Sequence, residues 1–256
     1  MLNFLDIEPR QGKPRETGLT SVIDHGIPLT EVDGLIEVAG AFVDLVKLGW
    51  GTGYVSAGVE RKIARYLERG VPVVIGGTLT EIAISQGRLE PFCDWLRSQS
   101  VTYVEVSAGT LDIPRERKLE VIGALAGEFT VLSEVGEKDP HAVVAPYRWV
   151  REIEEDLAAG AAKVITESRE SGNAGVFRPS GELREGLIEE IAERIDPGKL
   201  IFEAPLKEHQ VWFIERFGAD VNLGNIAPGD VIGLETLRLG LRADTAEQML
   251  FPDADR

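Results

Sequence analysis

The feature of this sequence that most constrains its fold is a two-part pattern that recurs along the whole chain. A short apolar run rich in β-branched residues ends at Gly, Asp, Glu or Lys, and an amphipathic stretch follows it. Near-continuous apolar runs are typical of strands buried on both faces, and parallel strands need helical connections. The pattern therefore predicts eight β-then-α units, with strands within 19–26, 43–52, 72–78, 102–110, 130–139, 162–172, 199–207 and 219–226.

Five of the connecting stretches carry clear helical spacing and caps, at 56–70, 114–129, 148–160, 180–195 and 208–218. Eight such units in 256 residues predict one α/β domain, a single (β/α)8 TIM barrel over 1–256. We expect a short N-terminal extension at 1–18 and a C-terminal tail at 246–256. The alternative, an open doubly wound sheet, usually carries a glycine fingerprint after its first strand. Here the glycines at 49–53 follow the second run, and Tyr54 stands where that fingerprint needs its last glycine.

The charge and the cysteine content exclude several classes of protein. The chain has 43 acidic and 27 basic residues, a formal charge of -16. Such a surface repels phosphates, so we expect no nucleic-acid or anionic-membrane partner. The single cysteine, Cys93, excludes a disulfide framework and a cysteine-based metal cage. With no apolar targeting segment and no apolar run of membrane-spanning length, we expect a cytoplasmic protein. Exposed barrel helices often pair, and we expect a homo-oligomer.

Acidic side chains collect at the ends of the predicted strands. In TIM barrels the reactive groups lie at the carboxyl ends of the strands. Here the fourth to seventh strands end with Glu105, Glu134, Glu167 and Glu203. Four carboxylates at one mouth would repel one another strongly, so a cation must offset them. An all-oxygen ligand set favours Mg²⁺ over Zn²⁺, and the alternative is an ion-pair network without metal.

Basic side chains follow the same strands. Lys47 lies inside the second apolar run, so it must point into a polar barrel mouth or pair with a strand-end acid. Lys138 follows Glu134 in the loop GEKDPH and is the best candidate for a general acid or base. The alternative for Lys138 is a solvated turn before Pro140. Arg169 follows the sixth strand and is a further candidate for the mouth.

Several polar and glycine-rich turns could bind a small anion. The turns at 49–53 and 76–78 can present backbone N–H groups, although such glycines often serve only the turn. Asn222 and Asn225 come from the eighth unit, where many barrels bind phosphate. His25 could bind an anion or transfer a proton, or could be structural. The residues alone therefore predict a barrel enzyme that handles a small anionic substrate, with Mg²⁺.

The sequence resembles the phosphosulfolactate synthase family nearly from end to end. The segments that carry the resemblance are KPRETGLTSVID (13–24), VKLGWGT (46–52), GGTLTE (76–81), VEVSAGT (104–110), LSEVGEKD (132–139), ESRESG (167–172), FEAPLKEHQVWFI (202–214), VNLGNI (221–226) and LETLRLGLRADT (234–245). The resemblance implies a TIM-barrel carbon–sulfur lyase that adds sulfite to phosphoenolpyruvate with Mg²⁺. The product would be (2R)-phospho-3-sulfolactate, the first intermediate of coenzyme M biosynthesis in archaea that make it.

That reaction gives each candidate residue an expected role. We expect Glu105, Glu134 and Glu167 to hold or surround the metal, and Lys138 to protonate C2 of the substrate. Lys47 and Arg169 would receive phosphate and sulfonate oxygens. The expected substrate-binding residues are Asp24, His25, Gly51, Thr52, Gly77, Thr78, Ser107, Asn222 and Asn225. The chain departs from the common family pattern at His25, where a lysine is usual, and at Ala108, where an aspartate is usual.

Two other functions are compatible with the same residues. One is Mg²⁺-assisted addition to, or elimination from, another phosphorylated enol or a 2-hydroxy acid. The other belongs to a different class, because plant members of this family are associated with heat-stress memory. Such a protein could act by interaction, without turnover.

Overall fold

The computed structural model describes residues 4–7, 9–136, 145–168, 175–178 and 180–251. Eight parallel strands form a closed barrel in which each strand pairs with its neighbours in the sequence, and β8 pairs with β1. This confirms the predicted (β/α)8 barrel. The strands are β1 (Thr20–Asp24), β2 (Leu45–Leu48), β3 (Val73–Ile75), β4 (Tyr103–Val106), β5 (Thr130–Val135), β6 (Lys163–Thr166), β7 (Leu200–Glu203) and β8 (Leu223–Ile226).

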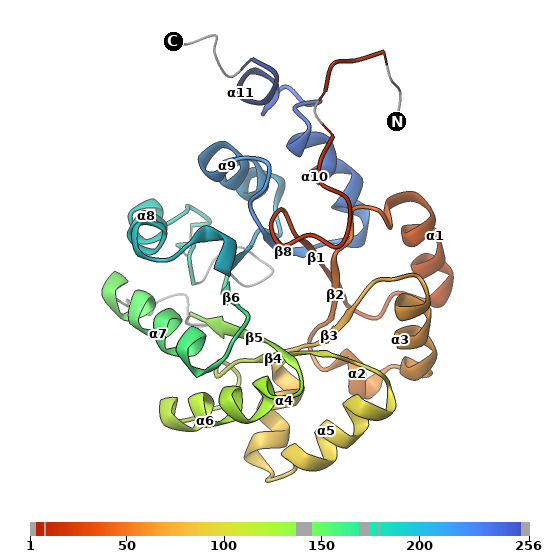
Figure 1. Cartoon of the computed structure of the whole chain (residues 1–256), viewed down its shortest axis with the longest axis vertical. Coiled ribbons are helices and arrows are strands. Elements are labelled where there is room, and N and C mark those ends of the chain that lie inside the picture. Colours follow the sequence, from red (N-terminus) through yellow and green to blue (C-terminus); the bar gives the residue numbers. More distant parts are fainter. Residues whose placement is uncertain (1–3, 8, 137–144, 169–174, 179, 252–256) are drawn as a thin grey trace.

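Helices surround the ring of strands, as Figure 1 shows. They are α1 (Leu29–Ala39), α2 (Thr52–Val55), α3 (Val59–Glu68), α4 (Gly77–Ser85), α5 (Leu89–Ser98), α6 (Arg115–Ala126), α7 (Pro146–Ala159), α8 (Glu185–Arg194), α9 (Lys207–Phe217), α10 (Val231–Arg238) and α11 (Ala246–Leu250). Two short 3₁₀ helices, η1 (Pro197–Lys199) and η2 (Pro228–Asp230), precede β7 and α10. Among the described residues, no helix combines the length and the apolarity needed to cross a bilayer.

Two expected helices begin later than their sequence patterns indicate: α3 starts at Val59 instead of 56, and α8 is the larger difference. The spacing predicted a helix from 180, but α8 starts at Glu185. Before α8, Phe177 and Leu183 make an antiparallel bridge, and the Arg184 N–H donates to the Val176 carbonyl at 2.9 Å. Gly181 has a φ of 86°, which a right-handed helix does not allow. These backbone bonds involve groups that a longer helix would have used.

The apolar core lies in two parts, separated by the barrel wall. The larger part fills the space between the strands and the helices. The smaller part lies inside the barrel and consists of Leu45, Val74, Leu132, Ile165 and Ile201, with Tyr103 packed against it. The inner layer closes the barrel, so any site at the carboxyl ends of the strands has an apolar floor.

The period of two along a strand explains which side chains enter the barrel mouth. Alternate residues of a strand point to opposite faces, so the inward residue after Leu45 is Lys47. In the same way Glu134 follows Leu132, and Glu203 follows Ile201. The charged side chains therefore form the layer directly above the apolar floor.

Candidate active site

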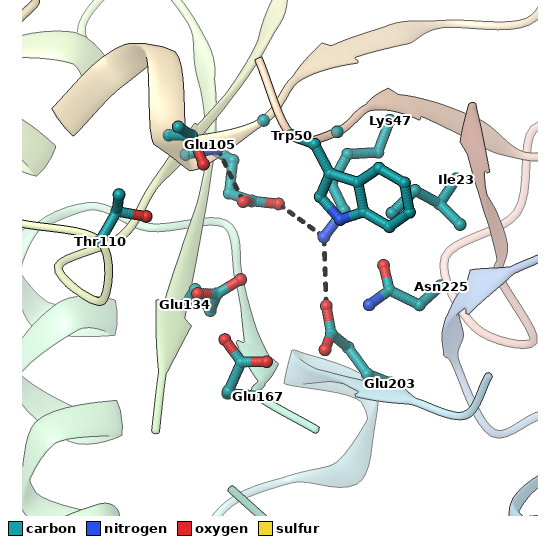
Figure 2. A pocket seen from close by; sticks show the side chains of 13 residues that line it. Ile23, Lys47, Trp50, Glu105, Thr110, Glu134, Glu167, Glu203 and Asn225 are labelled. Atoms are coloured by element: carbon teal, nitrogen blue, oxygen red, sulfur yellow. Dashed lines mark hydrogen bonds and ion pairs between the residues drawn. The ribbon is translucent and has the colours of Figure 1, made fainter. Parts of the chain in front are cut away.

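The carboxyl ends of the strands enclose a polar pocket of about 380 Å³. Its lining residues are Ile23, Lys47, Gly49, Trp50, Gly76, Gly77, Thr78, Glu105, Thr110, Glu134, Glu167, Glu203 and Asn225. Figure 2 shows the four glutamates and Asn225 around the pocket, with the Lys47 ammonium between Glu105 and Glu203. Side chains from all eight strands or strand ends thus meet at one place.

Lys47 is a buried cation held between two carboxylates. Its Nζ lies 3.2 Å from Glu105 Oε2 and 3.1 Å from Glu203 Oε1. Burial by itself would lower the pKa of Lys47, but Glu105, Glu203 and Glu134 together raise that pKa well above its ordinary value. Lys47 therefore stays protonated at neutral pH, and both sequence-based alternatives for it hold: it points into the mouth and it pairs with strand-end acids.

Glu105 is held from two sides. Its Oε1 accepts a 2.8 Å hydrogen bond from the backbone N–H of Gly77, the first residue of α4. Burial, together with Glu134 and Glu203, raises the pKa of Glu105, while Lys47 and the Gly77 N–H oppose that rise. A glycine is required at 77 because a Cβ there would clash with the side chain of Ser107.

Glu203, one of the four strand-end glutamates, received no role of its own from the sequence, and the structure gives it a positioning role. Its Oε1 faces Lys47, and its Oε2 accepts a 3.0 Å hydrogen bond from the backbone N–H of Ser168. The Ser168 hydroxyl lies 3.3 Å from the same oxygen. Glu203 thus ties the segment after β6 to Lys47.

Glu134 and Glu167 line the pocket on the side away from Asn225 in Figure 2. Among the described residues, no three carboxylate, imidazole or thiolate groups lie close enough together to hold one metal ion. The three expected metal ligands Glu105, Glu134 and Glu167 therefore share a pocket without forming a compact three-carboxylate cluster. Their oxygen chemistry still fits Mg²⁺, which commonly binds one or two carboxylates together with water and substrate oxygens.

Trp50 forms part of the rim of the pocket. Its backbone has a φ of 53°, in the left-handed region that non-glycine residues seldom adopt. The indole is 54% exposed and stacks on the ring of His25, with the ring centroids 3.7 Å apart and the planes 2° from parallel. His25 therefore lies at the rim, against Trp50, and outside the pocket lining.

The structure brings together seven of the expected site residues: Lys47, Gly77, Thr78, Glu105, Glu134, Glu167 and Asn225 all line the pocket. Asn225 has a φ of 54°, a conformation that Asn tolerates better than most residues. Two further expected residues, Lys138 and Arg169, lie outside the described residues.

The expectation for Asn222 is wrong in position. Asn222 precedes β8, so it lies at the amino end of the barrel, opposite the pocket. Its side-chain oxygen accepts from the Leu19 N–H at 3.0 Å, and its amide nitrogen donates to the Leu200 carbonyl at 2.8 Å. These bonds join β8 to the chain before β1 and to β7. Asn222 therefore has a structural role.

Asp24 also faces away from the pocket. Ile23 points into the barrel, so the next residue points outward, where the Asp24 carboxylate is fully buried. It accepts from Lys62 Nζ at 3.0 Å, from the Tyr66 hydroxyl at 3.1 Å, and from the N–H groups of residues 26 and 27. The expected role of Asp24 in substrate binding is therefore replaced by a role in anchoring α3 to the barrel.

Gly51, Thr52 and Ser107 lie near the mouth but do not line the pocket. The Thr52 hydroxyl donates to the Gly49 carbonyl at 2.7 Å, which closes the turn before α2. The Ser107 hydroxyl donates to the buried carboxylate of Glu81. Both hydroxyls are thus engaged within the loops, and the expected substrate contacts of Gly51, Thr52 and Ser107 stay predictions. Thr110 and Glu81 are site components that the sequence reading missed, although the segments 104–110 and 76–81 contain them.

Comparisons with known proteins identify the family of this chain. A sequence model of the (2R)-phospho-3-sulfolactate synthase family, ComA, matches residues 8–244. The chain belongs to this family. It is 43% identical to the phosphosulfolactate synthase of Bacillus subtilis, over 94% of this chain and 97% of the relative. Identity to the phosphosulfolactate synthase of Methanothermobacter thermautotrophicus is 41%, over 93% and 94% of the two chains.

More distant similarities are weaker. The protein HEAT-STRESS-ASSOCIATED 32 of Arabidopsis thaliana is 23% identical, over 92% of this chain and 91% of the relative. Among solved structures, the 3-hexulose-6-phosphate synthase of Salmonella typhimurium superposes with a TM-score of 0.55 at 14% identity, over 91% and 98% of the chains. That likeness concerns the fold alone.

Proposed function

We propose that this member of the phosphosulfolactate synthase family is a carbon–sulfur lyase that adds sulfite to phosphoenolpyruvate. The observation that carries the proposal is the identity of 43% to a phosphosulfolactate synthase over nearly the whole chain. A polar pocket with a buried lysine and four glutamates, at the barrel end where such enzymes act, supports it.

The reaction forms a C3–S bond and a C2–H bond and breaks the π bond between C2 and C3. The sulfur lone pair of sulfite attacks C3 of phosphoenolpyruvate, and the electron pair of the C2–C3 double bond moves to C2 and the adjacent carboxylate. A proton then adds to C2, giving (2R)-phospho-3-sulfolactate. Three anionic groups meet in this transition state, so the site must present fixed positive charge to them.

Lys47 supplies such a charge at the floor of the pocket. Because its pKa is raised well above the ordinary value, it is an electrostatic group rather than a proton acceptor at neutral pH. Glu105 and Glu203 hold its ammonium in place. We infer that Lys47 contacts an anionic oxygen of the substrate, with Gly77 and Thr78 lining the same wall.

Mg²⁺ is the cofactor that we propose for this site. Glu134 and Glu167 are the residues that would hold it, because their carboxylates line the pocket on the side away from Asn225 and supply the oxygen ligands that Mg²⁺ prefers. When bound, the ion would stabilise the negative charge that develops on the substrate carboxylate. Substrate and water oxygens would complete the ligand set.

Lys138 is the residue that we propose for protonation of C2, and Arg169 for binding the anionic groups. Both follow strands whose ends line the pocket, since Lys138 comes four residues after Glu134 and Arg169 comes two residues after Glu167. These two roles depend on sequence position, because both residues lie outside the described residues.

One experiment tests the function directly. The protein is incubated with phosphoenolpyruvate, sulfite and Mg²⁺, and the phosphorus NMR spectrum is followed. We expect a new phosphate-ester signal that requires both sulfite and metal, and that disappears with a chelator. Consumption without sulfite would indicate another reaction on a phosphorylated enol. Failure to bind any phosphorylated enol would contradict the proposal and favour the non-catalytic role.

A further inference from the structure

A buried glutamate that the proposed chemistry does not use lies behind one wall of the pocket. Glu81, on α4, is fully buried, and its carboxylate accepts hydrogen bonds from four groups of the loop after β4. Oε1 accepts from the Ser107 hydroxyl and from the Gly109 N–H at 3.1 Å. Oε2 accepts from the N–H groups of Thr110 at 2.8 Å and Leu111 at 2.6 Å.

The donors around Glu81 form a concave arrangement of the kind that binds anions. Successive backbone N–H groups that point to one place attract negative charge, and free loops of this type often bind phosphate. Here a side chain of the same protein occupies the concavity. A carboxylate suits it because both oxygens only accept, whereas an amide at this position would turn N–H groups towards N–H groups.

The loop that Glu81 holds carries a residue into the pocket. Thr110 lines the pocket, and Figure 2 shows its hydroxyl directed towards the space between the glutamates. The first residue of the same helix, Gly77, donates its N–H to Glu105. One short helix, α4, therefore fixes two parts of the wall: Glu105 through its first turn, and the loop of Thr110 through Glu81.

We propose that Glu81 is a positioning residue that orders the loop 107–111, and that the Thr110 hydroxyl so placed donates a hydrogen bond to an anionic oxygen of the substrate. The part concerning Thr110 rests on the proposed function. The part concerning Glu81 concerns the protein alone, so it can be tested without any substrate.

Amide hydrogen exchange tests the role of Glu81. In the wild type we expect slow exchange of the N–H groups of residues 109–111, because all three are bonded to Glu81. Glu81→Ala should raise exchange at these amides while the barrel strands stay protected. Added formate, a small carboxylate, should restore part of the protection. Glu90→Ala, at an exposed glutamate of α5, is the matched control. It should leave the exchange of residues 109–111 as in the wild type, with or without formate.

Unchanged exchange at residues 109–111 in Glu81→Ala would overturn the proposal. An absence of any effect of formate would also overturn it, because the carboxylate would then not be what orders the loop. If Glu81→Ala fails to fold, Glu81→Gln keeps the size of the side chain. We expect the same local rise in exchange there, because an amide cannot accept from all four donors.

Steady-state kinetics test the role of Thr110. Thr110→Val keeps the shape but removes the hydroxyl, and we expect KM for phosphoenolpyruvate to rise about tenfold, the effect of losing one hydrogen bond to a charged group. Thr110→Ser should restore KM to within about twofold of the wild type, because it returns the donor. An unchanged KM in Thr110→Val would overturn this part. If the wild type itself fails to consume phosphoenolpyruvate with sulfite, the proposed function and the role of Thr110 fail together, and the exchange result still decides Glu81.

Discussion

At the scale of single residues, the site depends on how one buried cation is shared. Lys47 contacts Glu105 and Glu203, which come from strands on either side of the barrel. Neither carboxylate would be stable at its buried position without a cation, because burial penalises an unpaired charge heavily. Glu134 and Glu167 line the same pocket, on the side away from Asn225.

A single substitution tests the proposed role of Lys138 as the proton donor. Lys138→Ala should lower turnover by about 10²–10⁴-fold, the usual range for a positioned acid or base. The measurement is kcat for sulfite-dependent consumption of phosphoenolpyruvate. Lys207→Ala is the matched control, because Lys207 pairs with Asp244 on the outside of the barrel and should leave turnover nearly normal. Near-normal turnover of a correctly folded Lys138→Ala protein would rule out the assigned role.

At the scale of elements, α4 determines one wall of the pocket through its close approach to β4. The contact needs a residue without a Cβ at Gly77, since a Cβ would overlap the Ser107 side chain. The helix then presents Glu81 one turn later, towards the loop after β4. The wall is therefore set by the packing of one helix against one strand end.

The packing of α4 predicts that replacing glycine by alanine has opposite effects on stability at two positions. Gly77→Ala should lower the free energy of unfolding by about 1–3 kcal/mol, the usual cost of overpacking. A Cβ added at Gly34, in α1, would meet no atom within 4 Å. Gly34→Ala should therefore raise the free energy of unfolding by about 0.5–1 kcal/mol, because alanine favours a helix. Urea denaturation of both variants measures the difference. A Gly77→Ala protein as stable as the wild type would show that α4 can move away from Ser107.

The start of α9 carries a group whose ionisation opposes folding. His209 is buried against Phe177, with the ring centroids 3.8 Å apart, and burial lowers its pKa below 6.5 although Glu208 acts in the opposite direction. The unfolded chain therefore binds this proton more readily than the folded one. The contribution of neutral His209 to stability is complete above about pH 6.5 and is lost as the pH falls towards the lowered pKa.

Thermal unfolding between pH 7 and pH 5 tests whether protonation of His209 lowers stability. His209→Phe keeps a ring on Phe177 and cannot bind the proton, so its Tm should fall less with acid than that of the wild type. The comparison uses the difference between the two proteins at each pH, which cancels the groups that they share. A constant difference across the range would show that His209 does not lose protons on folding.

At the scale of the whole molecule, the two ends of the barrel differ in their side chains. Hydrogen-bonded polar side chains close the amino end, and charged side chains line the pocket at the carboxyl end. Asn222 joins three segments there, and the buried Arg238 donates to the carbonyls of Leu19 and Val221. Both ends are thus polar, with the apolar inner layer between them.

Because Asn222 lies at the amino end of the barrel, we expect it to contribute to stability and not to substrate binding. Asn222→Ala should lower the free energy of unfolding by about 1–3 kcal/mol, because buried backbone groups lose their partners. KM for phosphoenolpyruvate should stay within about twofold of the wild type, as expected for a residue that makes no contact with the substrate. Chemical denaturation and steady-state kinetics on the same protein provide the two numbers. A large rise in KM without loss of stability would return Asn222 to the substrate site.

The sequence by itself determined the barrel and the charge of its mouth. Apolar runs at regular spacing can be buried only as parallel strands with helical crossovers, and this is local information. The period of two also places Lys47 and the glutamates above the apolar floor. Applied strictly, the same alternation excludes Asp24, because Ile23 already points inward.

Only the tertiary structure decided which of these groups meet. Lys47 and Glu203 lie 156 residues apart in the chain, and their contact follows from closure of the barrel. In the sequence Glu81 is the one charged residue of α4, and its four donors lie 26 to 30 residues further on. Asn222 lies only one residue before a short strand, yet that places it at the opposite end of the barrel. Spacing along the chain gives the direction of a side chain, whereas its partners depend on how distant elements pack, and packing is a property of the whole fold.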